Sequence, residues 1–419
     1  MKIEDLYTLY SKNFLVDTDT RNIRKNTLFF ALKGDNFNGN EFAKDALQLG
    51  ASYSIVDEKE YKTSDAIILV DHVLETLQKL AKYHRKQLNI PIIGLTGSNG
   101  KTTTKELIHC VLSEKYTTTA TKGNLNNHIG VPLTLLSMTP KTEIGIVEMG
   151  ANHLKEIAFL CTICEPDFGY ITNFGKAHLE GFGSLEGVIK GKSELYNYLQ
   201  THHKTAFVNP NDGIQIEKTK QLKTVPFKTV ELHFLEVNPF VKLSYKNSTI
   251  QSNLIGTYNY TNIAAAITIG DYLEVSLEKI KKAIESYTST NNRSQVIKTA
   301  SNTIILDAYN ANPSSMKAAL ESFALLKEPH KTVILGDMFE LGENSMKEHQ
   351  AIVDLTCELP IDTVFLVGEH FSRTHTESQQ FKSFKELQNH LIKTEIKKHA
   401  ILIKGSRGMQ LERVLELLS

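Results

Sequence analysis

Tryptophan is absent from this 419-residue sequence, and cysteine is scarce, with only Cys110, Cys161, Cys164 and Cys357. Four cysteines are too few for disulfide bonds to stabilise a chain of this length, so we expect a reducing, cytoplasmic environment. A charge excess is also lacking, because 47 lysines and arginines balance 47 aspartates and glutamates. Proteins that bind duplex DNA or anionic membranes normally carry a basic excess. The composition therefore predicts no nucleic-acid partner.

Long apolar runs are missing as well. No run approaches the roughly 18 residues needed to cross a bilayer, so we expect no membrane span. The first five residues do not resemble the start of a secretory signal, which again indicates a cytoplasmic protein. Hydrophobic residues make up 41% and charged residues 22%, as in folded soluble proteins. At roughly 150 residues per domain, the length predicts about three domains.

The spacing of Cys161 and Cys164 has two interpretations. Two intervening residues are typical of redox and metal-binding pairs, and a redox pair lies at the start of a helix. This pair instead falls near the end of a helix expected from about residue 154, among Ile157, Leu160 and Ile163. The apolar surroundings favour simple helix packing.

The alternation of apolar runs and helical patterns predicts three α/β segments. Residues 1–88 combine strand-like runs at 27–32, 53–56 and 66–70 with helices near 42–49 and 74–88. A proline linker follows at residue 91. Residues 89–290 contain expected strands at 92–96, 143–148, 168–172 and 206–209, helices at 102–116 and 259–272, and irregular or antiparallel β structure near 214–255.

Residues 291–419 repeat one pattern four times, an apolar run that ends in small or polar residues. The runs lie at 303–307, 332–336, 363–368 and 400–405, with helical patterns between them. This order predicts a parallel sheet with crossover helices. Ligands of such sheets bind at the carboxyl ends of the strands, where the polar residues collect.

A glycine-rich turn joins the expected strand at 92–96 to the next helix. Its residues are Gly97, Ser98, Asn99, Gly100, Lys101, Thr102 and Thr103. In a P-loop, the backbone N–H groups and the helix N-terminus surround phosphate oxygens, the lysine reaches the β- and γ-phosphates, and the threonine hydroxyl ligates Mg²⁺. The glycine spacing is shorter than in the general pattern, since position 95 is leucine. The turn predicts a nucleotide site, the alternative being a plain strand-to-helix turn.

A carboxylate follows the neighbouring apolar run at 144–147. Glu148 ends this run and is succeeded by Met149 and Gly150. Alone, a glutamate at a strand end is usually a solvated surface residue. Beside a phosphate-binding loop it becomes a candidate ligand for Mg²⁺.

The sequence resembles the Mur ligase family, which builds the bacterial cell-wall peptide, and the compact glycine spacing is that of the family. The resemblance covers the whole chain and rests on residues 19–21, 34–39, 96–103, 123–132, 148–150, 172–178, 256–262, 307–313, 336–342 and 404–407. Two positions depart from the pattern. Thr20 replaces a serine but keeps its hydroxyl, and Tyr258 replaces a histidine, so no role of that imidazole can be transferred.

The resemblance implies an α/β fold with three domains. Residues 1–88 would bind the UDP substrate, residues 89–290 would form a P-loop ATPase-like domain, and residues 291–419 would form a Rossmann-like domain that closes on ATP. The implied activity is ATP-dependent ligation of D-alanyl-D-alanine to UDP-N-acetylmuramoyl-tripeptide through an acyl phosphate and a tetrahedral intermediate. The product is the pentapeptide precursor of peptidoglycan, and the enzyme is expected to be a monomer.

The resemblance also implies roles for individual residues. ATP would contact the loop, Asn259, Asn262, Arg293 and Asp307, and the catalytic groups would be Lys101, His178, Lys192 and Arg293. Two Mg²⁺ ions would be held by Thr102, Glu148, His178 and a carbamylated Lys192. The substrates would contact Thr20, Arg21, Asn126, Asn127, Asn310, Asn312, Lys404, Ser406 and Arg407.

Several of these residues have simpler interpretations. His178 could be structural, and Lys190 could be mistaken for Lys192. Asn259 and Asn262 could simply start a helix, and residues 404–407 could be a loop after a buried strand.

Two other functions remain as alternatives. A folylpolyglutamate-type ligase would share the loop but lack the uridine-binding segment at residues 19–39. A nucleotide-gated binding protein without ligase activity would leave the motifs of the third segment unexplained. The sister ligase that adds diaminopimelate carries an Asp-Asn-Pro-Arg motif, which this sequence lacks.

Overall fold

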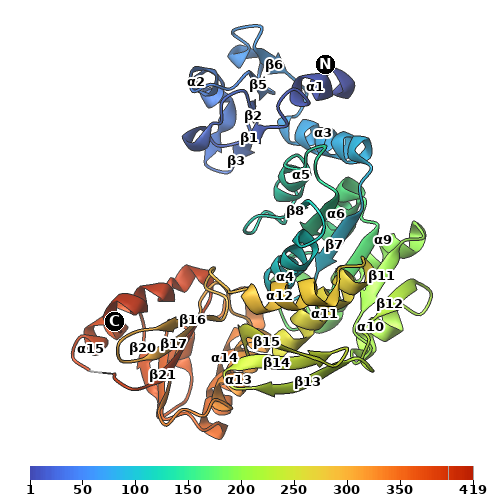
Figure 1. Ribbon diagram of the computed structural model, residues 1–419. Coiled ribbons are helices and arrows are strands. Elements are labelled where there is room, and N and C mark those ends of the chain that lie inside the picture. Colours follow the sequence, from blue (N-terminus) through green and yellow to red (C-terminus); the bar gives the residue numbers. More distant parts are fainter. Residues whose placement is uncertain (395, 419) are drawn as a thin grey trace.

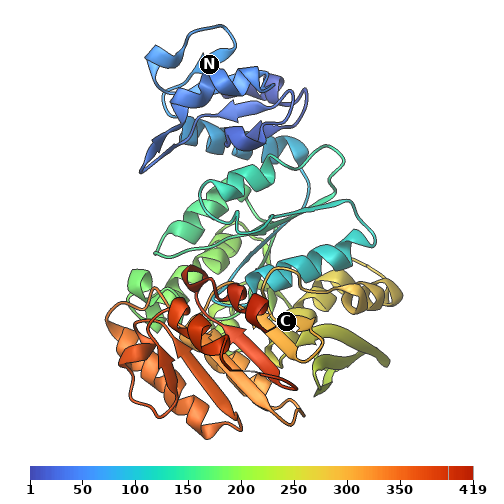
Figure 2. The same cartoon turned by 90° about the vertical axis from the view of Figure 1, so that its left-hand side faces the viewer.

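The computed structural model describes residues 1–394 and 396–418 as three α/β parts that follow one another along the chain. Figures 1 and 2 show the N-terminal part at one end of the molecule, the middle part next to it, and the C-terminal part against the far side of the middle part. The predicted α/β class is confirmed. No helix within these residues is long and apolar enough to cross a membrane.

The N-terminal part is a parallel sheet in the order β1-β2-β5-β6. Its strands are β1 (Val16–Asp17), β2 (Leu28–Phe30), β5 (Tyr53–Val56) and β6 (Ile67–Leu69), with a small hairpin of β3 (Lys33–Gly34) and β4 (Phe37–Asn38). Helices α1 (Ile3–Tyr10), α2 (Ala43–Gln48) and α3 (Val73–Leu88) accompany the sheet. Strands β2, β5 and β6 and helices α2 and α3 begin and end within two residues of the predicted ranges.

The middle part is built on a six-stranded parallel sheet in the order β12-β11-β10-β7-β9-β8. Successive side chains of the central strand β7 (Ile92–Thr96) enter two different hydrophobic cores. Ile92 belongs to the core that includes α5 (Gly130–Leu135) and α6 (Glu156–Cys164). Ile93 and Leu95 belong to the core that includes α4 (Lys101–Ser113) and α11 (Tyr258–Tyr272). This alternation follows from the two-residue period of a strand. The other strands are β8 (Thr118–Ala120), β9 (Ile144–Glu148), β10 (Phe168–Ile171), β11 (Thr205–Val208) and β12 (Lys223–Pro226).

Residues 214–255 were expected to be irregular or antiparallel, and the structure refines that prediction. Strands β13 (Leu232–Val237), β14 (Phe240–Tyr245) and β15 (Ser248–Ile255) form an antiparallel sheet. The preceding residues instead form α10 (Gly213–Lys218) and the parallel edge strand β12. Helices α7 (Leu179–Phe182), α8 (Leu185–Lys192), α9 (Glu194–Thr201) and α12 (Leu277–Ser286) complete this part.

The C-terminal part is a six-stranded sheet in the order β16-β17-β21-β18-β19-β20. The four predicted strands are its centre: β17 (Thr303–Asp307), β18 (Lys331–Gly336), β19 (Thr363–Val367) and β21 (Ala400–Lys404). Two short edge strands were not predicted, the antiparallel β16 (Gln295–Lys298) and the parallel β20 (Gln379–Phe381). The helices of this part are α13 (Pro313–Ala324), α14 (Ser345–Glu358) and α15 (Phe384–Leu391).

The Cys161 and Cys164 pair packs inside the molecule, as the apolar surroundings predicted. Both thiols are buried in α6, and their sulfurs lie 3.8 and 3.7 Å from the Met149 sulfur. Burial raises the pKa of Cys164 to about 12. A thiol that stays protonated is neither a nucleophile nor a metal ligand at neutral pH.

Buried polar contacts join the N-terminal part to the middle part. The Tyr10 hydroxyl donates to the Leu136 carbonyl at 2.8 Å, and His84 Nε2 lies 3.0 Å from the Met138 carbonyl. A carbonyl oxygen only accepts, so Nε2 carries the proton and donates it. Burial lowers the pKa of His84 to about 4.

We predict that acid weakens this interface through His84. Its pKa is lower in the folded than in the unfolded protein, so protonation favours unfolding as the pH falls from about 6.5 towards 4. Between pH 7 and 5 the loss is about 2 kcal/mol. Thermal unfolding followed across this range should show a flatter pH profile for His84→Gln, whereas His203→Gln, at an exposed histidine, should follow the wild type. Parallel profiles for wild type and His84→Gln would contradict the assignment.

Candidate active site

The glycine-rich loop connects β7 to α4 in a backbone conformation that only glycine adopts easily. Gly97 has φ of 143° and Gly100 has φ of 79°. A Cβ atom on Gly97 would lie 2.0 Å from the Thr172 hydroxyl, and one on Gly100 would lie 2.6 Å from Asn262 Oδ1. Both glycines are therefore required by conformation and by close packing.

Thr172 and Asn173, which directly follow β10, hydrogen-bond to the glycine-rich loop. Ser98 N donates to the Asn173 carbonyl at 3.0 Å, and Asn99 N donates to Asn173 Oδ1 at 3.1 Å. The Thr172 hydroxyl donates to the Asn99 carbonyl at 2.6 Å. These bonds fix the loop before any ligand binds, which reduces the ordering cost of binding.

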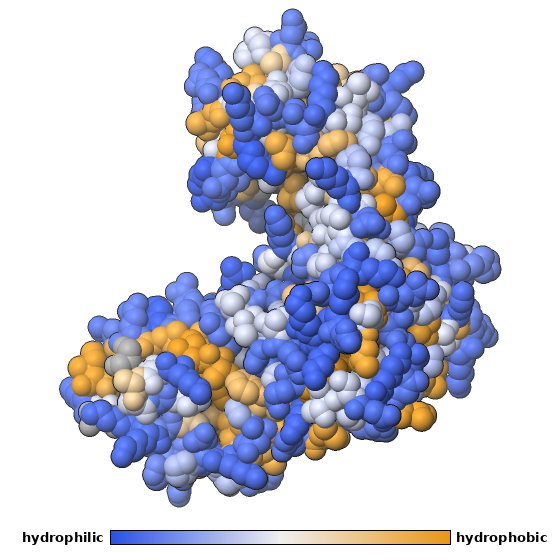
Figure 3. All heavy atoms as spheres, viewed as in Figure 1, coloured by the Kyte–Doolittle hydropathy of each residue, from blue (hydrophilic) through white to orange (hydrophobic). Residues whose placement is uncertain are grey.

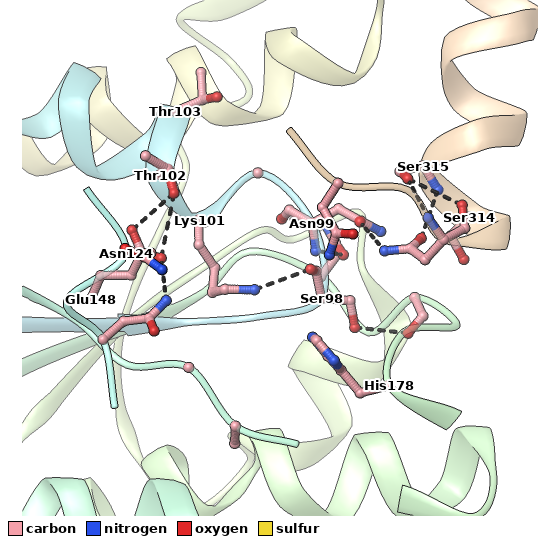
Figure 4. Close-up of a pocket in the computed structure, with 18 of the residues that line it drawn as sticks. Ser98, Asn99, Lys101, Thr102, Thr103, Asn124, Glu148, His178, Ser314 and Ser315 are labelled. Atoms are coloured by element: carbon pink, nitrogen blue, oxygen red, sulfur yellow. Dashed lines mark hydrogen bonds between the residues drawn. The ribbon is translucent and has the colours of Figure 1, made fainter. Parts of the chain in front are cut away.

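Lys101 folds back over its own loop. Its ammonium group donates to the Gly97 carbonyl oxygen at 2.6 Å. It also donates to the Ser98 carbonyl oxygen at 3.1 Å (Figure 4). Burial lowers the pKa of Lys101 to about 8, and the Glu148 carboxylate opposes that shift. A phosphate group is charged and therefore accepts hydrogen bonds more strongly than a carbonyl oxygen does. A bound phosphate can thus replace these carbonyls as the acceptor for the Lys101 ammonium group.

Glu148 lies at the carboxyl end of β9, directly beside the loop. The Thr102 hydroxyl is 3.1 Å from Glu148 Oε2 (Figure 4). Asn126 Nδ2 donates to Glu148 Oε1 at 2.8 Å. Glu148 is only 1% exposed, and its closest ammonium group, that of Lys105, is 3.8 Å away. A buried carboxylate beside a hydroxyl supplies the hard oxygen ligands that Mg²⁺ prefers.

The C-terminal part faces the loop across a cavity of about 1180 Å³. The Arg293 guanidinium stacks on the Tyr309 ring at 3.7 Å, and Lys404 Nζ donates to Asp307 Oδ2 at 2.5 Å. Among the described residues, Arg293 Nε has no hydrogen-bond partner. The predicted site residues that line the cavity are Ser98, Asn99, Gly100, Lys101, Thr102, Thr103, Asn126, Asn127, Glu148, His178, Asn259, Asn262, Arg293, Asp307, Asn310, Asn312 and Lys404.

His178 and Lys192 occupy different environments at this site. His178 Nδ1 lies 2.5 Å from Glu340 Oε2 of the C-terminal part, and this contact lowers the pKa of Glu340. Lys192 is fully buried, and its ammonium group donates to the Ala151 carbonyl at 3.0 Å. Burial, together with nearby Lys101, lowers the pKa of Lys192 well below its usual range. Lys190 is exposed, so the two lysines are clearly distinguished.

Asn259 and Asn262, which were predicted to contact ATP, connect two helices beside the cavity. Asn262 Nδ2 donates to Asn259 Oδ1 at 2.7 Å, and Asn262 Oδ1 accepts from the Thr104 hydroxyl at 3.1 Å. These bonds connect the start of α11 to α4. Tyr258, where the family pattern has histidine, has its hydroxyl 2.7 Å from the Ser294 hydroxyl, so it links the middle part to the segment leading into β16.

Several predicted substrate residues have structural contacts of their own. Asn127 Oδ1 caps the start of α5, and Asn312 Oδ1 caps α13. Thr20 and Arg21 lie in the N-terminal part, where Arg21 pairs with Asp19 at 2.6 Å. Outside the cavity lining are Gly97, Lys192, Thr20, Arg21, Ser406 and Arg407.

The structure adds residues that the sequence reasoning did not select. It also gives a predicted residue an unforeseen contact, since Asn312 Nδ2 donates to Asn99 Oδ1 at 2.7 Å and so joins α13 to the loop. Tyr309 and Glu340 lie in segments 307–313 and 336–342, which resemble the Mur ligase family. That resemblance was the sequence signal that could have identified them. Lys105 follows Lys101 by one helical turn, a spacing that places both on one face of α4.

Comparisons with known proteins agree with this arrangement. Three family models match: the Mur ligase family catalytic domain at residues 15–85, the Mur ligase middle domain at 95–270, and the Mur ligase glutamate ligase domain at 292–407. The UDP-N-acetylmuramoyl-tripeptide--D-alanyl-D-alanine ligase of Bacillus subtilis is 35% identical, covering 96% of this chain and 92% of the relative. The Escherichia coli ligase of that name is 33% identical, covering 96% and 93%.

Solved structures show the same architecture. A crystal structure of MurF from Acinetobacter baumannii matches with a TM-score of 0.86 at 31% identity, covering 96% of this chain and 92% of the other. The MurF ligase of Thermotoga maritima in complex with ADP has a TM-score of 0.84 at 28% identity and covers 96% of both chains.

The fold and the site thus define a three-part α/β protein in which a phosphate-binding loop faces a second α/β part. The chain belongs to the Mur ligase family.

Proposed function

We propose that this protein is an ATP-dependent ligase that joins D-alanyl-D-alanine to UDP-N-acetylmuramoyl-tripeptide. The observation that carries the proposal is the cavity in which the loop and Glu148 face Arg293, Asp307 and Lys404. The relatives named above, which align over nearly the whole chain, support this pair of substrates. The ADP complex of the Thermotoga maritima structure supports ATP as the cosubstrate.

The cavity suits the chemistry of amide formation. A carboxylate resists attack by an amine, so it is first activated by transfer of the γ-phosphoryl group of ATP, which gives an acyl phosphate and ADP. The amine then attacks the acyl carbon, and phosphate leaves from a tetrahedral intermediate. Lys101, the loop N–H groups and Arg293 would neutralise the crowded negative charge of carboxylate and triphosphate. The Arg293 side chain lines the cavity, and its buried Nε has no hydrogen-bond partner within the part of the chain that the structure describes.

The residues present fit one Mg²⁺ ion. Thr102 and Glu148 would hold it, and bound Mg²⁺ would neutralise charge on the phosphate oxygens. Asn126 Nδ2 donates to Glu148 Oε1, and the Thr102 hydroxyl lies 3.1 Å from Oε2 of the same carboxylate. A second ion would require His178 and Lys192, and an ammonium group cannot be a metal ligand.

Carbamylation would make Lys192 a suitable ligand. The lowered pKa of this buried lysine favours the neutral amine, which is the form that adds to CO₂ and yields a carboxylate-like carbamate. We predict a carbamate signal from Lys192 in carbon NMR spectra of protein equilibrated with labelled bicarbonate. The signal should disappear in Lys192→Ala and persist in Lys190→Ala. A spectrum with no such signal in the wild type would contradict the carbamate.

The N-terminal part would hold the uridine nucleotide, with Thr20 and Arg21 in contact with it. Figure 3 shows the surface hollowed between the N-terminal part and the C-terminal part. A substrate with a nucleotide at one end and a peptide carboxylate at the other could cross this hollow to the loop. Asn310, Asn312, Lys404, Ser406 and Arg407 would receive the dipeptide, and the enzyme would work as a cytoplasmic monomer.

An omission assay tests this function. With Mg²⁺, ATP, the UDP-linked tripeptide and D-alanyl-D-alanine, the protein should release ADP and phosphate and form the pentapeptide product. Leaving out the dipeptide should stop steady turnover. ADP release that is unchanged without the dipeptide would refute the proposal.

The folylpolyglutamate-type alternative has weaker support. A folylpolyglutamate synthase of Mycobacterium tuberculosis shares the fold at a TM-score of 0.61, but its identity is only 12%. The related ligases named above are similar over the N-terminal part as well.

A further inference from the structure

The P-loop helix α4 carries two charged residues that the proposed chemistry does not use. The Lys105 ammonium group is almost fully buried, 3.8 Å from Glu148 Oε2 and 4.0 Å from Glu106 Oε1. A buried charge is costly unless it is paired. Lys105 thus pairs with two carboxylates, one at the candidate metal site and one pointing away from it.

Glu106 connects this pair to the segment between the middle and C-terminal parts. The Tyr287 hydroxyl donates to Glu106 Oε2 at 2.5 Å, and Asn291 Nδ2 donates to Oε1 at 2.9 Å. Burial and the Glu106 carboxylate raise the pKa of Tyr287, so the hydroxyl keeps its proton and remains a donor. Each carboxylate oxygen therefore accepts one bond from this segment.

The segment held by Glu106 is the one that carries Arg293. Residues 287–294 connect α12 to β16, and the Ser289 hydroxyl donates to the Arg293 carbonyl at 2.6 Å. Asn291 Oδ1 lies 3.1 Å from the same hydroxyl, whose single proton faces both acceptors. The position of the Arg293 backbone is thus connected to the P-loop helix through Asn291 and Glu106.

We propose that Glu106 is a positioning residue that fixes residues 287–294 on the P-loop helix and so directs Arg293 to the nucleotide phosphates. Lys105 holds the Glu106 and Glu148 carboxylates together, which links the metal site to the arginine. The inference rests on the proposed function only in taking Arg293 as a phosphate contact. A glutamine at position 106 has no negative charge and only one acceptor atom, so Tyr287 and Asn291 can no longer each donate to a different carboxylate oxygen.

A double-mutant cycle tests the proposal. Glu106→Gln, Arg293→Ala and the double variant are compared for binding of the non-hydrolysable analogue AMPPNP with Mg²⁺, by calorimetry, and for kcat/KM of ADP release. We expect Glu106→Gln to lower kcat/KM about tenfold and AMPPNP affinity about fivefold in the wild-type background, but less than about twofold when Arg293 is already alanine. Tyr287→Phe should show the same pattern more weakly.

Glu114→Gln is the matched control. Glu114 lies at the other end of α4 and pairs with Lys282 of α12 at 3.1 Å, so it joins α4 to the helix that precedes residues 287–294 rather than to that segment itself. This variant should bind and turn over like the wild type. Equal effects of Glu106→Gln and Glu114→Gln, or independent effects of Glu106→Gln and Arg293→Ala, would overturn the proposal.

Two features of the experiment keep the proposal falsifiable. If Glu106→Gln unfolds, the same cycle is carried out with Tyr287→Phe, which removes one bond and no charge. AMPPNP binding does not depend on ligation, so a wild-type protein that binds AMPPNP but makes no product refutes the proposed function. The binding cycle then still decides whether Glu106 acts through Arg293.

Discussion

Lys101→Ala should lower kcat/KM for the ligation by about 10³-fold, since it removes the cation that the loop directs at the transferred phosphoryl group. Alanine also removes the donor to the carbonyl oxygens of Gly97 and Ser98, which accept from Lys101. The measurement is the steady-state rate of ADP release at saturating dipeptide. Thermal unfolding should change little, because the side chain contributes charge rather than core packing.

Two comparisons make the Lys101 result specific. Lys101→Met keeps most of the side-chain volume and should be as inactive as Lys101→Ala, which separates charge from space. Lys141→Ala removes an exposed lysine of the same part and should leave the rate unchanged. Activity of Lys101→Ala within tenfold of the wild type would remove this loop from the mechanism.

Glu148→Gln should lower kcat/KM by about 100-fold and raise the Mg²⁺ concentration needed for half-maximal activity. The amide keeps the shape of the side chain but loses its negative charge. It also removes one of the two carboxylates, Glu148 and Glu106, that pair with the buried Lys105 ammonium group. The measurement is the rate of ADP release across a series of Mg²⁺ concentrations.

The control for Glu148 lies at the other end of the same strand. Glu143 immediately precedes β9, is exposed, and accepts from the Thr117 backbone N–H at 2.7 Å. Glu143→Gln should leave the Mg²⁺ requirement unchanged. Identical Mg²⁺ curves for Glu148→Gln and the wild type would show that Glu148 does not hold the ion.

The central strands of the fold could be predicted because their sequence signal is local. Strand β17 has the predicted bounds, since its apolar run is buried on both faces and ends in a polar residue. The edge strands β16 and β20 carry mixed polar and apolar residues, and their pairing depends on a neighbouring strand rather than on their own pattern. Short, partly exposed strands therefore escaped prediction.

The phosphate loop could be predicted for the same reason, because its glycines, lysine and threonine are consecutive. The contacts between the middle and C-terminal parts could not. Asn99 with Asn312, and His178 with Glu340, are brought together by the packing of two separate sheets. No periodicity within either segment encodes that distance. The sequence identified the motifs that contain these residues but not which atoms meet.

Transfer of oxygen from the peptide carboxylate to phosphate tests the central claim most directly. The UDP-linked tripeptide is labelled with ¹⁸O in the carboxylate that reacts, and the phosphate released during ligation is examined by mass spectrometry. An acyl phosphate requires one labelled oxygen to leave with the phosphate, so each phosphate formed with product should carry one ¹⁸O. Unlabelled phosphate accompanying pentapeptide formation would contradict the account.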